Sequence, residues 1–282
     1  MNLITEELAK FLLQGKNNRA MLVSIITITY NSENYLEETI KSVISQDYSN
    51  IEYIIIDGGS IDGTPNIIKK YRSKISKWIS EPDEGISDAM NKGIRMASGE
   101  IIGIIHSDDF YADSTVIKRV VEIFTMNAEI KAVYGIQDFV DPVTNKLILT
   151  WGRDSHPSEI KKRMYIPHPT LFVRREVYDT IGLFRKDFKV AMDYEWAIRL
   201  IKYTKPYFLN YKIACMRDSG TSGKQFQQSF RESAKALFEN KYYFHAIMTM
   251  FRNVIKRALI VLGLKRFLYK LWGKNVSPQN VK

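Results

Sequence analysis

Runs of β-branched and apolar residues recur through the first hundred positions, and each run ends abruptly at polar residues. The runs cover residues 21–29, 51–56, 75–80 and 100–105. Continuous apolar runs of this length, without strict alternation, are typical of parallel strands buried on both faces. Between the runs, apolar residues recur with helical spacing over 32–43, after Thr64-Pro65 and over 86–97. This alternation predicts a doubly wound α/β sheet.

The pattern changes after Asp109. Further elements are expected as helices over 113–126, 175–181 and 190–203, a hairpin over 132–148, and strands over 167–173, 207–209 and 213–216. Because no linker interrupts these elements, we expect one Rossmann-like α/β domain with a mixed central sheet. Its expected segments are an N-terminal helix (1–20), a first half (21–112), a second half (113–222) and C-terminal amphipathic helices (223–282).

Acidic residues follow the second, third and fourth predicted strands. They are Asp57, the pair Asp83-Glu84 and the pair Asp108-Asp109. The carboxyl ends of parallel strands meet at one edge, where open α/β sheets bind ligands. Adjacent carboxylates are unfavourable without a cation, and a divalent metal with oxygen ligands is the simplest occupant. Two alternatives stay open: one of the pair caps the next helix, or the carboxylates bind ribose or base donors.

Composition and motifs exclude several classes of protein. The hydrophobic fraction of 45% and charged fraction of 26% are those of a folded globular chain. Cys215 is the only cysteine, which excludes a disulfide framework and a cysteine metal site, and residues 1–20 lack a signal-peptide pattern. We therefore expect a cytoplasmic setting. Neither G-x-G-x-x-G nor a P-loop follows the first strand, and no nucleophile elbow occurs.

The ordered motifs resemble family 2 glycosyltransferases of the GT-A fold, especially bacterial members that build colanic-acid-like surface polysaccharides. The similarity extends from Val23 to Ser222. The matching segments are SIITITYN (24–31), IDGGSIDGT (56–64), EPDEGISDAMNKGI (81–94), ASGE (97–100), SDD (107–109), GLF (182–184) and MDYE (192–195). Each segment alone is a weak signal, but their order and spacing together are specific.

The resemblance implies roles for individual residues. Residues 21–112 would bind a nucleotide-diphosphate sugar, with Asp57 on the nucleoside and Asp109 as ligand of Mg²⁺ or Mn²⁺. Residues 113–222 would bind the acceptor, with Asp193 as catalytic base. The other donor-side candidates are Thr29, Asn31, Gly59, Asp88, Asn91, Lys92, Ser107, Asp108, Arg217 and Ser222. The acceptor-side candidates are His168, Tyr194 and Trp196. A structural role is the alternative for His168, whereas Tyr194 and Trp196 are expected to pack the helix of Asp193, with stacking on a sugar face as the alternative. His106 is expected to be a packing residue at a strand end.

The implied reaction is inverting, metal-dependent hexosyl transfer from a UDP-sugar to a growing, lipid-linked glycan of a bacterial surface polysaccharide. One base and one metal-assisted leaving group suffice for a single displacement. Four positions depart from the family's usual residues and leave the donor sugar open, namely Gly58, Met90, Ser107 and Met192. A non-catalytic, sugar-nucleotide- or glycan-binding relative is the competing class, against which Asp109 and Asp193 argue.

The positive charge is concentrated in the C-terminal segment. Of the net charge of +10, nine charges belong to residues 240–282, which contain no Asp or Glu, and the first 239 residues carry +1. Phe244, Met248 and Phe251 fall on one helical face there. We expect a basic amphipathic segment over 241–274 that holds the protein on the inner face of the cell membrane. The alternative is a helix that packs on its own domain or on another subunit. No aromatic-basic motif for nucleic acid accompanies the charge.

Overall fold

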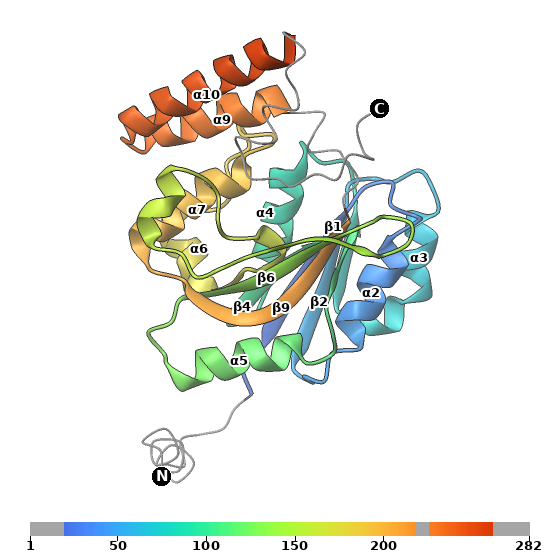
Figure 1. Ribbon diagram of the computed structural model, residues 1–282. Helices are drawn as coiled ribbons and strands as arrows, with labels where there is room; N and C mark the ends of the chain where they lie inside the picture. Colours follow the sequence, from blue (N-terminus) through green and yellow to red (C-terminus); the bar gives the residue numbers. More distant parts are fainter. Residues whose placement is uncertain (1–19, 218–225, 262–282) are drawn as a thin grey trace.

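The computed structural model of the chain describes residues 20–217 and 226–261 (Figure 1). Most of the helix expected over 1–20, Ser222, and the end of the basic segment lie outside the described residues. In the described part, the fold agrees with the expected single α/β domain with a mixed sheet.

The predicted parallel half is confirmed. Its strands are β1 (Val23–Thr29), β2 (Ile51–Asp57), β3 (Lys77–Ser80) and β4 (Ile101–His106). They lie in the order β3-β2-β1-β4, and each neighbouring pair is parallel. Every residue of β1 is buried, as its unbroken apolar sequence requires for a strand covered on both faces.

The second half of the sheet is mixed. Continuing from β4, its strands are β8 (Phe172–Arg174), β6 (Ala132–Val140), β9 (Tyr207–Arg217) and β5 (Asp109–Tyr111), with β7 (Leu147–Trp151) paired to β6. The expected hairpin is confirmed as the antiparallel pair of β6 and β7. The chain turns sharply between β4 and β5, and β5 pairs with β9 at the far end of the sheet.

Two expectations for this half are corrected, and one strand was not predicted. The strand predicted over 167–173 is a 3-10 turn, η3 (His168–Thr170), followed by the short strand β8, because two prolines around His168 cannot donate to a ladder. The two strands predicted over 207–209 and 213–216 are one strand, β9, whose register against β6 shifts in the middle. Strand β5 is absent from the prediction, since three residues are too few for a periodic signal.

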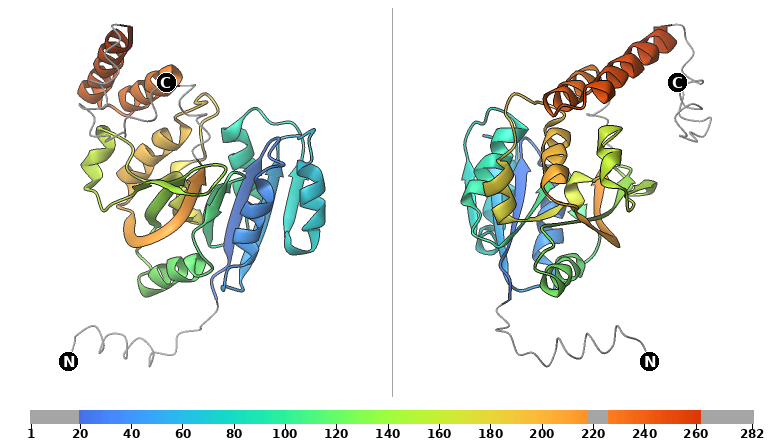
Figure 2. Two further views of the ribbon diagram at one scale, coloured as in Figure 1. Left: turned by 45° about the vertical axis from the view of Figure 1, so that its right-hand side comes forward. Right: turned by 90° about the vertical axis from the view of Figure 1, so that its left-hand side faces the viewer.

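Helices cover both faces of the sheet (Figures 1 and 2). One face packs against α2 (Leu36–Ile44), α3 (Thr64–Lys70) and α5 (Val116–Met126). The other packs against α4 (Ile86–Met96), α6 (Arg175–Ile181) and α7 (Met192–Tyr203). Two short 3-10 turns, η1 (Arg72–Lys74) and η2 (Pro157–Lys161), complete the domain.

The C-terminal helices α9 (Phe226–Glu239) and α10 (Tyr243–Val261) form a pair outside the sheet layers. Helix α9 contacts α7, and α10 lies on the outer side of the pair (Figure 2). This pair therefore extends the layer that contains α7.

Candidate active site

The carboxyl edge of the parallel strands gathers the acidic residues that the sequence places after them. Thr29 is the register partner of Asp57, which pairs with Ser80, and Ile28 pairs with His106. The ends of β1, β2, β3 and β4 are thus adjacent, as predicted. Helix α5 begins only at Val116, and Asp109 lies in β5, so neither aspartate of the pair caps the following helix.

Asp57 is fully buried and holds the turn after β2. Its carboxylate accepts hydrogen bonds from the backbone N–H of Ser60 and from the hydroxyl of Ser80, at 2.6 Å from the latter. A nucleobase would have to share or replace these partners. The glycine at position 58, which departs from the family pattern, is explained by its surroundings, because a Cβ there would lie 2.6 Å from Oδ2 of Asp83. The carboxyl group of Asp83 therefore occupies the space of a side chain at position 58.

Asn31 connects the loop after β1 to the turn after β2 through hydrogen bonds. Its backbone is left-handed, with φ of 48°, its side-chain Oδ1 accepts from the N–H of Ile61, and its own N–H donates to the hydroxyl of Ser60. Gly59 has φ of 81°, and a Cβ would come within 3.3 Å of the backbone nitrogen of Pro82. Both residues therefore shape the predicted donor side. The buried hydroxyl of Thr29 has no hydrogen-bond partner in the described part of the chain.

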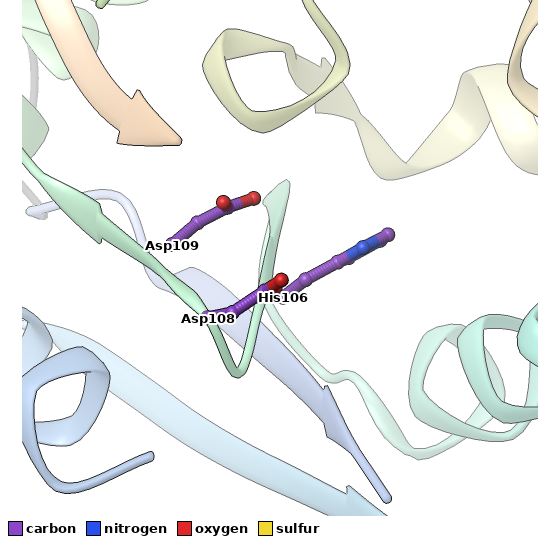
Figure 3. A group of neighbouring side chains, drawn as sticks. All are labelled: His106, Asp108 and Asp109. Atoms are coloured by element: carbon purple, nitrogen blue, oxygen red, sulfur yellow. The ribbon is translucent and has the colours of Figure 1, made fainter. Parts of the chain in front are cut away.

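The best candidate for a cation site is the turn from β4 to β5 (Figure 3). One potential ligand atom from each of His106, Asp108 and Asp109 lies within 4.8 Å of the others. Asp109 is 2% exposed, and its Oδ1 has no partner among the described residues. Burial, and then the charge of Asp108, raise the pKa of Asp109 well above its usual range. A divalent cation bound here would satisfy the orphaned oxygen, so these residues fit a metal.

Two placements in this turn differ from the expectations. His106, expected to be a packing residue, belongs to the candidate cation cluster, and its Nε2 has no partner among the described residues. Ser107 is buried, and its hydroxyl shares a hydrogen bond of 2.7 Å with that of Ser32, so it connects this turn to the loop after β1.

Arg217 stabilises the turn between β4 and β5. Its guanidinium donates to the backbone oxygen of Asp108 at 2.7 Å, pairs with Glu38, and lies 5.0 Å from the ring of Tyr35 and 4.8 Å from that of Phe110. The side chain is 2% exposed. In this arrangement Arg217 positions Asp108 and Asp109, and it does not present its charge to a diphosphate as the resemblance implies.

Three further donor-side candidates on α4 are engaged with the protein itself. Asn91 is buried and exchanges two hydrogen bonds with the backbone of Phe184. Asp88 pairs with Lys186 at 2.6 Å, which lowers the pKa of Asp88, and Lys92 pairs with Glu81 at 2.8 Å. These residues fix the 81–85 loop and the segment before α7, so their effect on a donor would be indirect.

An aromatic row connects the cation cluster to α7. The ring of His168 lies 5.6 Å from that of His106 and 5.8 Å from Phe184, and Phe184 lies 5.4 Å from Trp196. Burial lowers the pKa of His168 to about 3, so it packs as a neutral ring. Trp196 is 1% exposed and donates to the carbonyl of Gly182. His168 therefore lies beside the donor-side cluster, whereas the resemblance implies the acceptor side. Trp196 is a core residue, which agrees with packing of the helix and leaves no face for stacking on a sugar.

Asp193 lies in the first turn of α7 and lines a cavity of about 760 Å³. Burial raises its pKa to about 6, although the N–H of Tyr194 donates to it at 2.7 Å. Tyr194 also lines the cavity, and its hydroxyl donates to the carbonyl of Ile160. A carboxyl group with a pKa near neutrality in a cavity of ligand size has the properties of a general base.

Glu232 on α9 caps α7 from outside the helix. The described residues give α7 no side-chain cap of its own, and Glu232 accepts from the N–H groups of Lys189, Val190 and Ala191 at 2.8–3.1 Å. Its carboxylate is buried, and these donors lower its pKa. A negative group at a helix N-terminus is stabilising. Glu232 thus fixes the start of the helix that carries Asp193, a role that no local sequence signal indicates.

Comparison with known proteins assigns the family. The family model described as "Glycosyl transferase family 2" matches residues 24–187. An uncharacterized glycosyltransferase of Mycobacterium tuberculosis is 32% identical over 216 residues, which cover 74% of this chain and 80% of that protein. A PGL/p-HBAD biosynthesis glycosyltransferase of Mycobacterium bovis is 26% identical over 64% of this chain and 70% of its own length.

Solved structures share the fold. Residues 1–349 of S. aureus TarS in complex with UDP superpose with a TM-score of 0.62 at 21% identity, over 77% of this chain and 65% of that one. The match spans 40% of a longer TarS chain. The mannosyltransferase PcManGT from Pyrobaculum calidifontis, in complex with GDP-Man and Mn²⁺, gives 0.60 at 16% identity, over 96% and 88% of the two chains. Together with the family match and the mixed sheet, these findings confirm the expected fold. The chain belongs to glycosyl transferase family 2 and is a glycosyltransferase of the GT-A fold.

Proposed function

We propose that this glycosyltransferase moves a hexosyl group from a UDP-sugar to a lipid-linked glycan acceptor of a bacterial surface polysaccharide, with inversion at the anomeric carbon. The observation that carries the proposal is the buried carboxylate oxygen of Asp109 at the carboxyl edge of the parallel strands, which has no partner in residues 20–217 and 226–261. Open α/β sheets bind nucleotides at such an edge. Support comes from the related folds, which were solved with UDP, UDP-GlcNAc, or GDP-Man and Mn²⁺.

Asp109 would hold Mg²⁺ or Mn²⁺, with Asp108 and His106 as the neighbouring ligand groups. When bound, the cation would neutralise the charge that grows on the nucleoside diphosphate as it leaves. Arg217 supports this role because its hydrogen bond to the backbone oxygen of Asp108 fixes the turn that carries these groups.

Asp193 would be the catalytic base. Its carboxylate would take the proton from an acceptor hydroxyl while that oxygen forms a bond to the anomeric carbon. The bond from the anomeric carbon to the diphosphate oxygen breaks in the same step, and the electron pair stays with the nucleotide. One displacement inverts the configuration. The raised pKa of Asp193, about 6, suits a base that must accept a proton near neutral pH.

Thermal unfolding with a panel of nucleotides tests the donor assignment. We expect UDP and at least one UDP-sugar to raise the Tm when Mn²⁺ is present, because a ligand that binds only the folded state stabilises it. ADP and GDP serve as matched controls for the nucleobase. A rise of equal size with GDP would contradict the UDP assignment, and no rise with any nucleotide would contradict the proposal as a whole.

We further propose that α10 rests on the cytoplasmic face of an anionic membrane. Phe244, Ile247, Met248 and Phe251 follow helical spacing on one face, and all are exposed, Phe244 to 70%. This placement argues against packing of that face on its own domain. No helix among the described residues is long and apolar enough to cross a membrane. The basic residues of 240–282 would complement anionic lipid.

Substitution of the exposed aromatic residues tests this membrane proposal. The double variant Phe244→Ser/Phe251→Ser should lose at least about tenfold in affinity for vesicles that contain anionic lipid, since it removes the two exposed aromatic side chains of this face. Met126→Ser, at an equally exposed apolar position on α5, is the matched control. Sedimentation with vesicles measures both variants, and undiminished binding of the double variant would refute the membrane role of α10.

A further inference from the structure

The turn after β2 has no side chain at position 58, and a carboxylate from another loop lies in its place. A Cβ at Gly58 would be 2.6 Å from Oδ2 of Asp83 and 3.4 Å from the ring of Tyr30. Asp83 belongs to the 81–85 loop, which follows β3. Its carboxylate therefore stands at the carboxyl edge of β2, where a side chain of residue 58 would project.

The nearby carboxylate of Asp57 is already engaged by the protein. Its Oδ1 accepts hydrogen bonds from the hydroxyl and the N–H of Ser60, and its Oδ2 accepts from the hydroxyl of Ser80 at 2.6 Å. Asp57 is fully buried. Because these bonds join the turn after β2 to the end of β3, Asp57 has a structural task that a ligand would have to disrupt.

Asp83, in contrast, has one engaged oxygen and one free oxygen. Its Oδ1 accepts from the N–H of Gly85 at 2.7 Å. Its Oδ2 accepts no hydrogen bond from residues 20–217 or 226–261, and the side chain is only partly buried. The bond to Gly85 fixes the orientation of the carboxylate, so Oδ2 stays directed at Gly58. A carboxylate oxygen accepts and does not donate, so a ligand at this place must bring a donor.

Two residues of α4 hold the loop that carries Asp83. Lys92 donates to the carbonyl of Pro82 at 3.1 Å, and Asp88 accepts from an N–H of the same loop at 3.2 Å. A contact group that is fixed before the ligand binds reduces the entropy that binding must overcome. Asp88 and Lys92 thus position Asp83, although their own charged groups are engaged with the protein.

The width of the sheet indicates which part of a nucleotide would meet Asp83. Strand β1 lies between β2 and β4, and the candidate cation turn follows β4. Neighbouring strands are about 4.8 Å apart, so the ends of β2 and β4 are separated by roughly 10 Å. A nucleotide whose diphosphate lies at the cation turn would place its ribose over the end of β1. Its base would then lie at the end of β2, beside Asp83.

We propose that Asp83 recognises the base of the donor, and that its Oδ2 accepts a hydrogen bond from the imide N–H of uracil. Cytosine has an unprotonated nitrogen at this position, so two acceptors would face each other and both would remain unpaired. The ring of Tyr30, 62% exposed, offers a flat apolar surface beside the carboxylate. This inference rests on the proposed function and names the residue that selects the nucleobase.

Nucleobase preference tests the inference. UDP and CDP are titrated by calorimetry, with Mn²⁺ present, into the full-length wild type and the variant Asp83→Asn. We expect the wild type to bind UDP at least tenfold more tightly than CDP. In the variant the amide oxygen keeps the bond to the N–H of Gly85, so its NH₂ group faces the base. That group opposes the N–H of uracil and can donate to cytosine. Affinity for UDP should therefore fall at least about tenfold, and the preference for UDP should be lost.

Two further variants separate recognition of the base from stability of the site. Glu84→Gln, at an exposed position of the same loop, is the matched control and should keep both affinities. Asp57→Asn should weaken UDP and CDP by the same factor and lower the Tm, because it removes hydrogen bonds of the turn and leaves the group that faces the base unchanged.

Each contrary outcome identifies what has failed. An undiminished preference for UDP in Asp83→Asn, or loss of that preference in Asp57→Asn alone, would overturn the inference. Equal affinity of the wild type for UDP and CDP would also overturn it, whereas binding of UDP itself would stand. Failure of the wild type to bind UDP would instead contradict the proposed function, so the two failures are distinguishable.

Discussion

Replacing Asp193 by asparagine is expected to lower the rate of sugar transfer at least about a hundredfold and to leave donor binding unchanged. An amide of the same shape cannot accept the proton of the acceptor hydroxyl, and a positioned base contributes on the order of 10²–10⁴ in rate. Transfer is measured as release of the nucleoside diphosphate in the presence of acceptor, and donor affinity by calorimetry. Asp179→Asn, at an exposed position on α6, is the matched control.

The pH dependence of the transfer rate is a second test of Asp193 as the catalytic base. Because burial raises the pKa of Asp193 to about 6, the carboxylate is the dominant form above that pH and is lost below it. The rate at saturating donor should therefore fall about tenfold per pH unit below 6 and level off above it. A profile that is flat between pH 5 and 8, or a variant Asp193→Asn with undiminished transfer, would contradict the assignment of the base.

Asp109→Asn is expected to abolish stimulation of transfer by divalent cations and to lower the rate at saturating Mn²⁺ at least about a hundredfold. The substitution keeps the shape of the buried side chain and removes the anionic oxygen that would hold the cation. Asp83→Asn tests another carboxylate at the same edge of the sheet, one that lies beside Gly58 and outside the cation cluster. Loss of cation dependence in Asp83→Asn, with Asp109→Asn unaffected, would show that the cation site has been misplaced.

Asp109→Asn should lower the rate of transfer but raise the stability of the folded protein. In cation-free buffer the raised pKa of Asp109 makes its ionised form unfavourable in the folded state. A carboxyl group whose pKa is higher in the folded than in the unfolded state does not lower stability at pH values below its unfolded pKa. The loss of stability grows as the pH rises from there through the folded pKa. Asp109→Asn should therefore have a higher Tm than the wild type at pH 8, with a smaller difference at pH 4. A lower Tm at pH 8 would contradict the burial of an uncompensated carboxylate.

The parallel half of the fold and the position of its acidic edge could be predicted because each strand is a continuous apolar run ending in polar residues. Parallel pairing brings the ends of these strands to one edge, where the structure makes Thr29, Asp57 and Ser80 register partners. The mixed half was less predictable. Strand β5 has three residues, and its partner β9 is more than ninety positions away, so no local pattern indicates their pairing.

Side-chain roles that depend on distant partners could not be predicted either. The resemblance places Arg217 on the donor side, yet the fold buries its guanidinium against the backbone of Asp108 and against Glu38. Glu232 lies in an ordinary amphipathic helix, and its function as a cap depends on the N–H groups of residues about forty positions earlier. Asn91 lies within a family motif and Trp196 directly follows one, but Asn91 bonds to the backbone of Phe184 and Trp196 to that of Gly182 in the core.

Calorimetric titration of UDP into the wild type and into Asp109→Asn, each with and without Mn²⁺, tests the central claim most directly. If Asp109 holds the cation that joins the nucleotide to this edge of the sheet, Mn²⁺ should tighten UDP binding at least tenfold in the wild type. The variant should show no such increase, because the two ligands are then no longer coupled. Equal UDP affinity with and without Mn²⁺ in the wild type, or an equal increase in both proteins, would contradict this account of the active site.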